Sequence, residues 1–198
     1  MLERVRRLLI GLFVVFCWPA NSFGDETFWN LPQDLSAKNT NITFEVDTTW
    51  HKVHGVAEAV NGKVWLEDLG NYSSVRGEVV IPVEKLDTDN GPRDKKMRNV
   101  MAASTYPQIK FSLSSVDGLC PLEVLENQKQ CDLTLKGKLS IRDVEQEMLI
   151  LGSLSKVNGK YRVSGKFGID WSAFGVEDPS IIIARVKRDV EITFQLDL

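Results

Sequence analysis

Two histidines, His51 and His54, are the side chains of this sequence best suited to acid–base chemistry or metal binding. They lie three residues apart in WHKVHG, a spacing that would place both on one face of a helix. The surrounding residues favour a strand, however, and an odd spacing in a strand sends two side chains to opposite faces. A tetrahedral metal site also needs further ligands, and no cysteine or acidic cluster lies at a suitable spacing. We therefore expect no metal site and no cofactor.

The sequence also lacks the motifs of common enzyme classes. It has no Gly-x-Ser-x-Gly elbow, no cysteine paired with a histidine and no glycine-rich phosphate-binding loop. Its many acidic residues fall on the expected outer faces of strands, where hydration explains them. No basic stripe is present that could neutralise the phosphates of a nucleic acid. We expect neither catalysis nor nucleic-acid binding.

Residues 1–24 have the pattern of a secretory signal peptide. Three arginines begin it, the apolar run LLIGLFVVFCW follows, and Ser22 and Gly24 supply small residues at the −3 and −1 positions of a cut. The run is short for a membrane span, which needs about 20 apolar residues, although an uncleaved anchor stays the alternative. We expect export to the periplasm, cleavage after Gly24, and one mature domain over residues 25–198 with a net charge of −5.

The expected mature chain contains two cysteines, Cys120 and Cys131. In an oxidising compartment, a bridge between them would close a short loop and contribute about 3 kcal/mol of stability. The segment CPLEVLENQKQC has no histidine and lacks the Cys-x-x-Cys spacing of redox motifs. We expect a structural disulfide, with two free thiols as the alternative.

Apolar and polar residues alternate with period two through most of the chain, which predicts strands. In NITFEVD, for example, Ile42, Phe44 and Val46 share one face and polar residues take the other. The same pattern predicts strands in residues 60–67, 74–83, 108–116, 132–141, 145–154, 160–170 and 190–196. Each strand has one polar face, so we expect a single antiparallel β-barrel of about eight strands.

Glycines occur inside several of the predicted strands. They are Gly55, Gly62, Gly77, Gly137, Gly152 and Gly165. A glycine within a strand usually marks a bulge, a tight bend or a close approach of another group. Their number supports a closed barrel over a flat sheet.

One charged segment, residues 88–111, interrupts the strands. Asp89 or Asn90 can cap a helix, Pro92 suits its first turn, and Pro107 lies beyond its end. Three apolar side chains share one face of that helix: Met97, Val100 and Met101. We expect a short helix whose apolar face lies over the barrel mouth, either as a lid above a binding cavity or as a simple filling of the barrel end.

Four segments resemble, in order and spacing, the YceI family of periplasmic lipid-binding proteins. They are LDTDNGPRDKKMRN, YPQIKF, GKLSIRDVEQEM and FGIDWSAFGV, and the resemblance runs from Asn41 to the C-terminus. It implies a lipocalin-like antiparallel barrel with a helix near its opening and a tunnel for a long apolar chain. Such a chain would be a polyisoprenoid, the tail of an isoprenoid quinone or a fatty amide. A homodimer is also implied.

The resemblance and the inward rows together predict the ligand contacts. The apolar candidates are Phe44, Val46, Met97, Met101, Phe111, Leu113, Phe167, Ile169, Trp171 and Phe194. The head-group candidates are His51, Arg93 and Asp94. The Arg93–Asp94 pair is also consistent with a structural clamp, which we favour. The sequence departs from the family pattern at Trp171, where a basic residue is usual, and this change is expected to reshape the tunnel.

Two functions follow as hypotheses. In the first, the protein is a periplasmic carrier or store that holds an isoprenoid or acyl chain inside its barrel. In the second, its own side chains fill the barrel, and the outer surface docks a membrane redox partner. An open interior would favour the first hypothesis, and a filled interior would favour the second.

Overall fold

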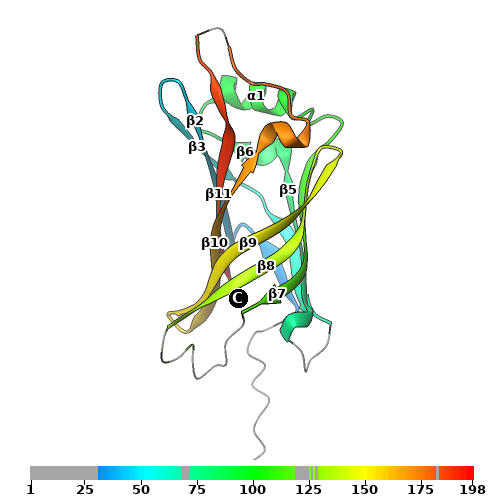
Figure 1. The fold of residues 1–198 in the computed structure, drawn as a ribbon, viewed down its shortest axis with the longest axis vertical. Coiled ribbons are helices and arrows are strands. Elements are labelled where there is room, and N and C mark those ends of the chain that lie inside the picture. The colour runs from blue at the N-terminus through cyan, green and yellow to red at the C-terminus, as the bar shows by residue number, and fades with distance from the viewer. Residues whose placement is uncertain (1–30, 68–71, 119–124, 126, 128, 182) are drawn as a thin grey trace, which may run out of the picture.

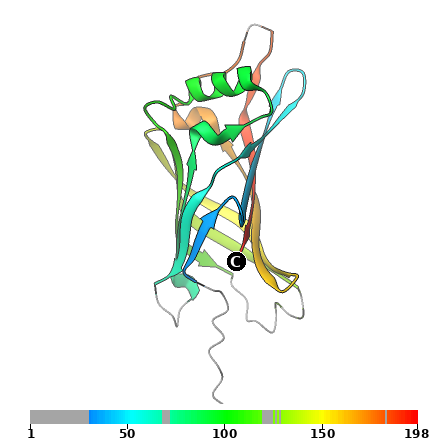
Figure 2. The same ribbon diagram turned by 180° about the vertical axis from the view of Figure 1, so that it is seen from behind.

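The computed structural model describes residues 31–67, 72–118, 125, 127, 129–181 and 183–198. Within them, eleven strands form one antiparallel sheet in the order β1-β4-β5-β7-β8-β9-β10-β11-β2-β3-β6. The strands are β1 (Gln33–Ser36), β2 (Thr40–Thr48), β3 (Lys52–Ala57), β4 (Asn61–Leu66), β5 (Val75–Pro82), β6 (Leu86–Asp87), β7 (Gln108–Asp117), β8 (Gln130–Ile141), β9 (Val144–Val157), β10 (Lys160–Asp170) and β11 (Val186–Asp197). Figures 1 and 2 show that the sheet curls around an interior space.

The predicted fold, an antiparallel barrel with one short helix, is confirmed. All eight predicted strands are present, and the additional three are β1, β3 and β6. β1 has four residues and β6 has two, which is too short for an alternating pattern to be recognised. These two strands are the edges of the sheet, so its curl is not closed by hydrogen bonds between its first and last strands in the described residues.

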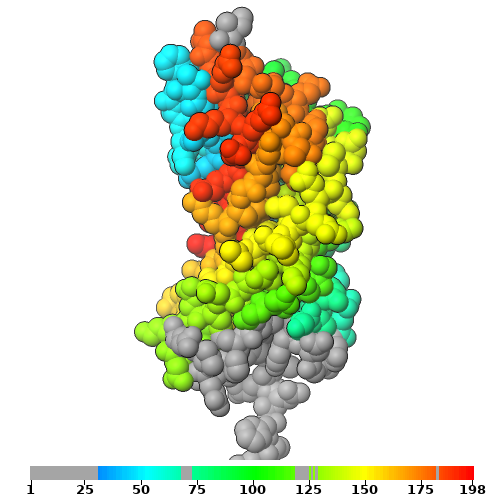
Figure 3. Space-filling model, viewed as in Figure 1, coloured from blue at the N-terminus to red at the C-terminus, as the bar shows by residue number. Residues whose placement is uncertain are grey.

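Alternation along β8 explains how the wall is built. Its side chains switch between exposed and buried positions, and the four predicted inward residues, Leu133, Leu135, Leu139 and Ile141, are all buried. β9 pairs with β8 over twelve residues, from Gln130↔Ser155 to Ile141↔Val144. On the face shown in Figure 3, side chains of β8 to β11 form a continuous outer wall.

One α-helix, α1 (Gly91–Val100), lies across one end of the barrel (Figures 1 and 2). It begins where predicted, because the Asn90 side chain accepts a hydrogen bond from the Arg93 amide at 3.0 Å and a proline occupies the first turn. It ends at Val100, Met101 is its C-cap, and the next residue, Ala102, has a φ of 51°. The described residues also contain three 3₁₀ turns: η1 (Tyr72–Ser74), η2 (Val83–Lys85) and η3 (Trp171–Phe174).

The end of the barrel opposite α1 holds a densely packed core, which we call the packed end. Its members include Leu35, Val75, Leu125, Leu133 and Leu154, each at most 4% exposed. Cys131 belongs to the same cluster and is disulfide-bonded. The other predicted half of the bridge, Cys120, lies outside the described residues, as does the predicted signal peptide, so that pairing and the cleavage site stay predictions.

Candidate ligand-binding site

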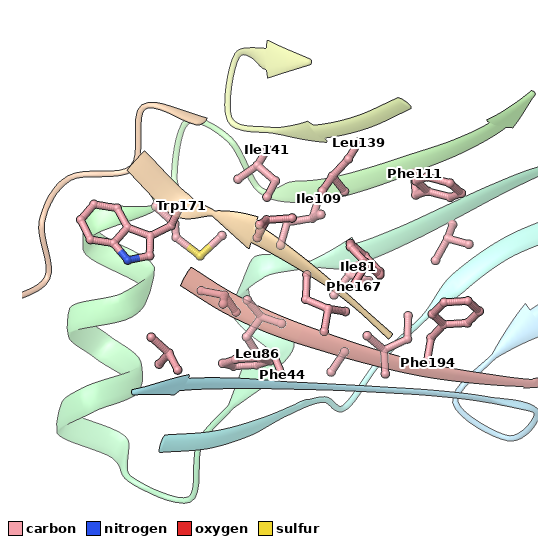
Figure 4. Close-up of a pocket in the computed structure, with 18 of the residues that line it drawn as sticks. Phe44, Ile81, Leu86, Ile109, Phe111, Leu139, Ile141, Phe167, Trp171 and Phe194 are labelled. Carbon is pink, nitrogen blue, oxygen red and sulfur yellow. The ribbon is translucent and has the colours of Figure 1, made fainter. Parts of the chain in front are cut away.

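A cavity of about 650 Å³ extends along the interior of the barrel from α1 to the packed end, where Leu35, Val75 and Leu133 line it. Nearly all of its lining is apolar and comes from the inward rows of the strands (Figure 4). Residues far apart in sequence, such as Phe44, Phe111 and Phe194, line it together. Its volume lies within the range typical of small-molecule sites, which is about 300–1,000 Å³.

Three phenylalanines of the cavity wall, Phe44, Phe111 and Phe194, have their rings against strand glycines. Phe44 pairs with Gly55 on β3, and its ring occupies the space that a Cβ on Gly55 would need. The ring of Phe194 lies over Gly165 in the same way, and that of Phe111 over Gly137. Phe167 and Phe194 meet edge to face, with ring centroids 6.4 Å apart. The strand glycines therefore allow close approach of aromatic rings, which leaves the centre of the barrel open.

Helix α1 contributes the apolar face predicted for it. Met97, Val100 and Met101 all line the cavity, and the two methionines pack against a cluster that includes Leu86 and Ala103. Both expected roles, lid and filling, required this orientation. The helix covers a cavity, so the structure favours the lid.

Three of the family-like segments meet beside this lid. The Arg142 guanidinium carbon lies 5.5 Å from the centre of the Tyr106 ring, and Arg142 donates a hydrogen bond to the Gly175 carbonyl. Trp171 lines the cavity at the same end, where its indole N–H donates to the Lys187 carbonyl at 2.8 Å. These contacts fix the end of the barrel around α1 and η3.

Arg93 and Asp94 form the structural clamp that the sequence analysis favoured. Asp94 is 5% exposed and accepts hydrogen bonds from the Thr88 amide and hydroxyl. Arg93 donates from Nε to the Thr88 hydroxyl at 2.8 Å and from Nη2 to the Thr88 carbonyl at 2.6 Å. Burial raises the pKa of Asp94, but the hydrogen bonds, led by that from the Thr88 hydroxyl, outweigh it, and the net pKa is lowered. Asp94 does not line the cavity, whereas Arg93 does.

The two histidines differ in their relation to the cavity, and His51 lies just before β3 rather than within it. His51 lines the cavity at its exposed end. His54 lies on the outer face of β3, with Nδ1 2.9 Å from an oxygen of Glu45. In the described part of the chain, no group of three or more histidine, cysteine or acidic residues is placed to hold a metal ion.

Within the described residues, the exposed part of the cavity lining gathers at one end, which we call the mouth. Five of its lining residues are exposed: Trp50, His51, Pro92, Lys96 and Ile181. They come from the β2–β3 turn, the first half of α1 and the segment before β11. All other lining residues are buried or half-buried.

All ten predicted apolar contacts line the cavity: Phe44, Val46, Met97, Met101, Phe111, Leu113, Phe167, Ile169, Trp171 and Phe194. The sequence analysis missed Trp50 and Ile181 at the mouth. These residues lie outside the long alternating strands, and the signal that could have identified them is an apolar side chain within a turn or loop segment.

Comparisons with known proteins agree with this architecture. The crystal structure of Burkholderia cenocepacia BcnA has a TM-score of 0.68 and 18% identity, and the match covers 83% of this chain and 99% of that one. A polyisoprenoid binding domain from Saccharophagus degradans has a TM-score of 0.63 and 11% identity, covering 83% and 95%. The Campylobacter jejuni YceI protein has a TM-score of 0.55 and 16% identity, covering 74% and 84%. These likenesses show a shared fold.

No curated protein sequence matches the chain. Residues 34–198, however, match the YceI-like domain family, and this range contains every described strand but the first residue of β1. The chain therefore belongs to the YceI-like family.

Proposed function

We propose that this protein is a periplasmic lipid-binding protein that carries or stores a long apolar chain inside its barrel. The observation that supports this function best is the 650 Å³ cavity, with its apolar lining and an exposed mouth. The chain would be a polyisoprenoid, the tail of an isoprenoid quinone or a fatty amide. The protein acts by binding, without catalysis.

The half-buried state of the lining supplies the driving force. Phe44, Phe167 and Ile192 point inward, yet each stays partly accessible because the cavity reaches it. Covering apolar surface with an apolar chain contributes about 25 cal/mol per Å². Each CH₂ group of the ligand removed from water contributes about 0.8 kcal/mol in addition to packing contacts. A lipid with a long tail is thus the kind of molecule that this cavity would retain in water.

Family membership supports the same class of ligand, since one structural relative is described as a polyisoprenoid binding domain. The alternative, a filled barrel that docks a membrane redox partner through its outer surface, gives no role to an apolar cavity. Export to the periplasm belongs to the proposal because it rests on the predicted signal peptide. Among the described residues, no helix is long and apolar enough to cross a membrane.

Native mass spectrometry of protein purified from its own host tests the proposal. We expect a co-purified hydrophobic mass that is released on unfolding. Ile192→Trp should reduce retention of that mass by about tenfold or more, because Ile192 faces inward between Phe44 and Phe167. Thr193→Trp is the matched control, since it introduces the same side chain at the next position of β11, on the other face. A bare mass in every preparation would contradict the proposal.

A further inference from the structure

The end of the barrel that carries the mouth also exposes large apolar side chains. Trp50, Ile181 and Ile183 are 71%, 57% and 72% exposed, and we call these three residues the tip. Figures 1 and 2 show that the segment leading into β11 projects beyond α1 at this end, and that the β2–β3 turn reaches about the level of α1. Two tip residues, Trp50 and Ile181, also line the cavity, so the exposed apolar surface is continuous with the lining of the mouth.

Hydrogen bonds hold the two halves of the tip together. The Trp50 indole N–H donates to the Ile183 carbonyl at 2.9 Å, and the Thr49 amide donates to the Arg185 carbonyl at 2.9 Å. Ile181 and Ala184 exchange two backbone hydrogen bonds across a tight turn. The polar atom of the Trp50 ring is therefore satisfied within the protein, and the part of the ring that faces solvent is apolar.

Charges of both signs lie near the tip, and the cations follow it directly in the sequence. Residues 183–188 contain Arg185, Lys187 and Arg188, with acidic residues on either side at 177, 178 and 189, and Lys96 is exposed at the mouth. Lys187 is paired with Asp47 at 3.0 Å. The pKa of Asp178 is lowered, first by the hydrogen bond from Ser180 and further by the two arginines. Exposed tryptophan and isoleucine flanked by arginine and lysine are typical of surfaces that lie in the interface of a phospholipid bilayer.

We infer that the tip docks on a phospholipid bilayer and places the cavity mouth at the membrane surface. This inference rests on the proposed function and adds the membrane as the partner from which the ligand enters. A chain moving from the bilayer into the cavity would then pass along the apolar surface of Trp50 and Ile181 without crossing water. The cations beside the tip would face phosphate groups of the lipids.

Flotation of the purified protein with protein-free vesicles of phosphatidylcholine and phosphatidylglycerol tests this inference. We expect the wild-type protein to float with the vesicles. Ile183→Ser should lower the affinity for vesicles, measured as the partition coefficient, by about tenfold, because removing one inserted side chain of this size changes a binding constant by about that factor. Leu151→Ser is the matched control. Leu151 is also 72% exposed but lies on the side wall, in β9, and its substitution should leave binding unchanged.

Trp50→Ala provides a second variant and should weaken vesicle binding in the same direction. Ile183 does not line the cavity, so Ile183→Ser should keep its co-purified mass in native mass spectrometry. Failure of the wild-type protein to float while it retains a lipid would overturn the docking inference alone. A bare protein that still floats would overturn the proposed function alone. Binding to native membranes but not to protein-free vesicles would identify a membrane protein as the partner and would also overturn the inference.

Discussion

The two ends of the barrel are built from the same alternating rows of apolar residues but differ in how those rows pack. At the packed end, Leu125 and Leu154 are fully enclosed by neighbours and do not line the cavity. Nearer α1, Ile81 and Phe167 point into the same interior and stay half-buried. One end thus stabilises the fold, and the other keeps apolar surface available. The difference teaches that inward orientation and complete burial are separate properties of a side chain.

The largest expected effect is the difference in stability loss between a substitution at the packed end and one nearer α1. Leu154→Ala should lower the free energy of unfolding by about 2–5 kcal/mol, because it leaves a cavity in a closed core. Ile81→Ala removes an isomeric side chain from the wall of an existing cavity and should cost only about 1–2 kcal/mol. Urea unfolding of both variants measures the difference. Equal losses would show that the two ends are packed alike.

A smaller loss of stability is expected for a substitution in the clamp that Arg93 and Asp94 form beside the mouth. Asp94→Asn should lower the free energy of unfolding by about 1–3 kcal/mol, because it weakens the hydrogen bonds that a buried carboxylate accepts from Thr88.

The clamp also predicts a pH dependence. The pKa of Asp94 in the folded protein lies below its ordinary value of 3.8, so its contribution is complete above that value and is lost as the pH falls through the folded pKa. Unfolding free energies at a series of pH values should therefore show wild type and Asp94→Asn converging in acid. A difference that stays constant down to that range would argue against an ionised Asp94.

Gly55→Ala tests whether the position of the Phe44 ring governs binding in the cavity. A methyl group on Gly55 would collide with the Phe44 ring, which can move only toward the interior. We expect about a threefold to tenfold loss of affinity for a long-chain apolar probe, with a smaller loss of stability than Leu154→Ala. Gly91→Ala is the control, since a Cβ there meets nothing within 4 Å. Unchanged affinity in Gly55→Ala would mean that the position of the Phe44 ring does not govern binding.

The smallest effect is expected from the histidines. His54→Ala should leave retention of the co-purified mass unchanged, because His54 lies on the outer face beside Glu45. His51→Ala should reduce retention of the co-purified mass by no more than about threefold. The substitution removes one solvent-exposed polar contact at the mouth, and the loss of one such contact has about that effect. Native mass spectrometry of both variants compares them. A large loss in His54→Ala would contradict the assignment of faces.

Alternation predicted the strands and their inward residues well, because a strand that has one buried face must show that pattern. It predicted β8 with Leu133 and Leu139 inside, but it missed β1, β3 and β6. β1 and β6 have too few residues to show a period. The helix was predicted from Asn90 and the apolar spacing after it, since capping and periodicity are both local.

Other features of the site depend on contacts that the fold creates, so local sequence patterns could not predict them. The partner that Asp94 finds in Thr88 depends on how the chain turns before α1. Trp50 and Ile183 are 133 residues apart in the sequence, and only the fold brings them together at the tip. Whether the inward rows enclose open space depends on ring positions such as that of Phe44 over Gly55, which alternation does not encode.

The central claim is that the barrel encloses an apolar cavity that accepts a chain through its mouth. Titration of delipidated protein with linear prenols of increasing length tests it most directly. Affinity should rise by about fourfold for each CH₂-sized group added, at 0.8 kcal/mol per group, and should level off once the chain fills the cavity. A weak affinity that does not change with chain length would contradict the claim.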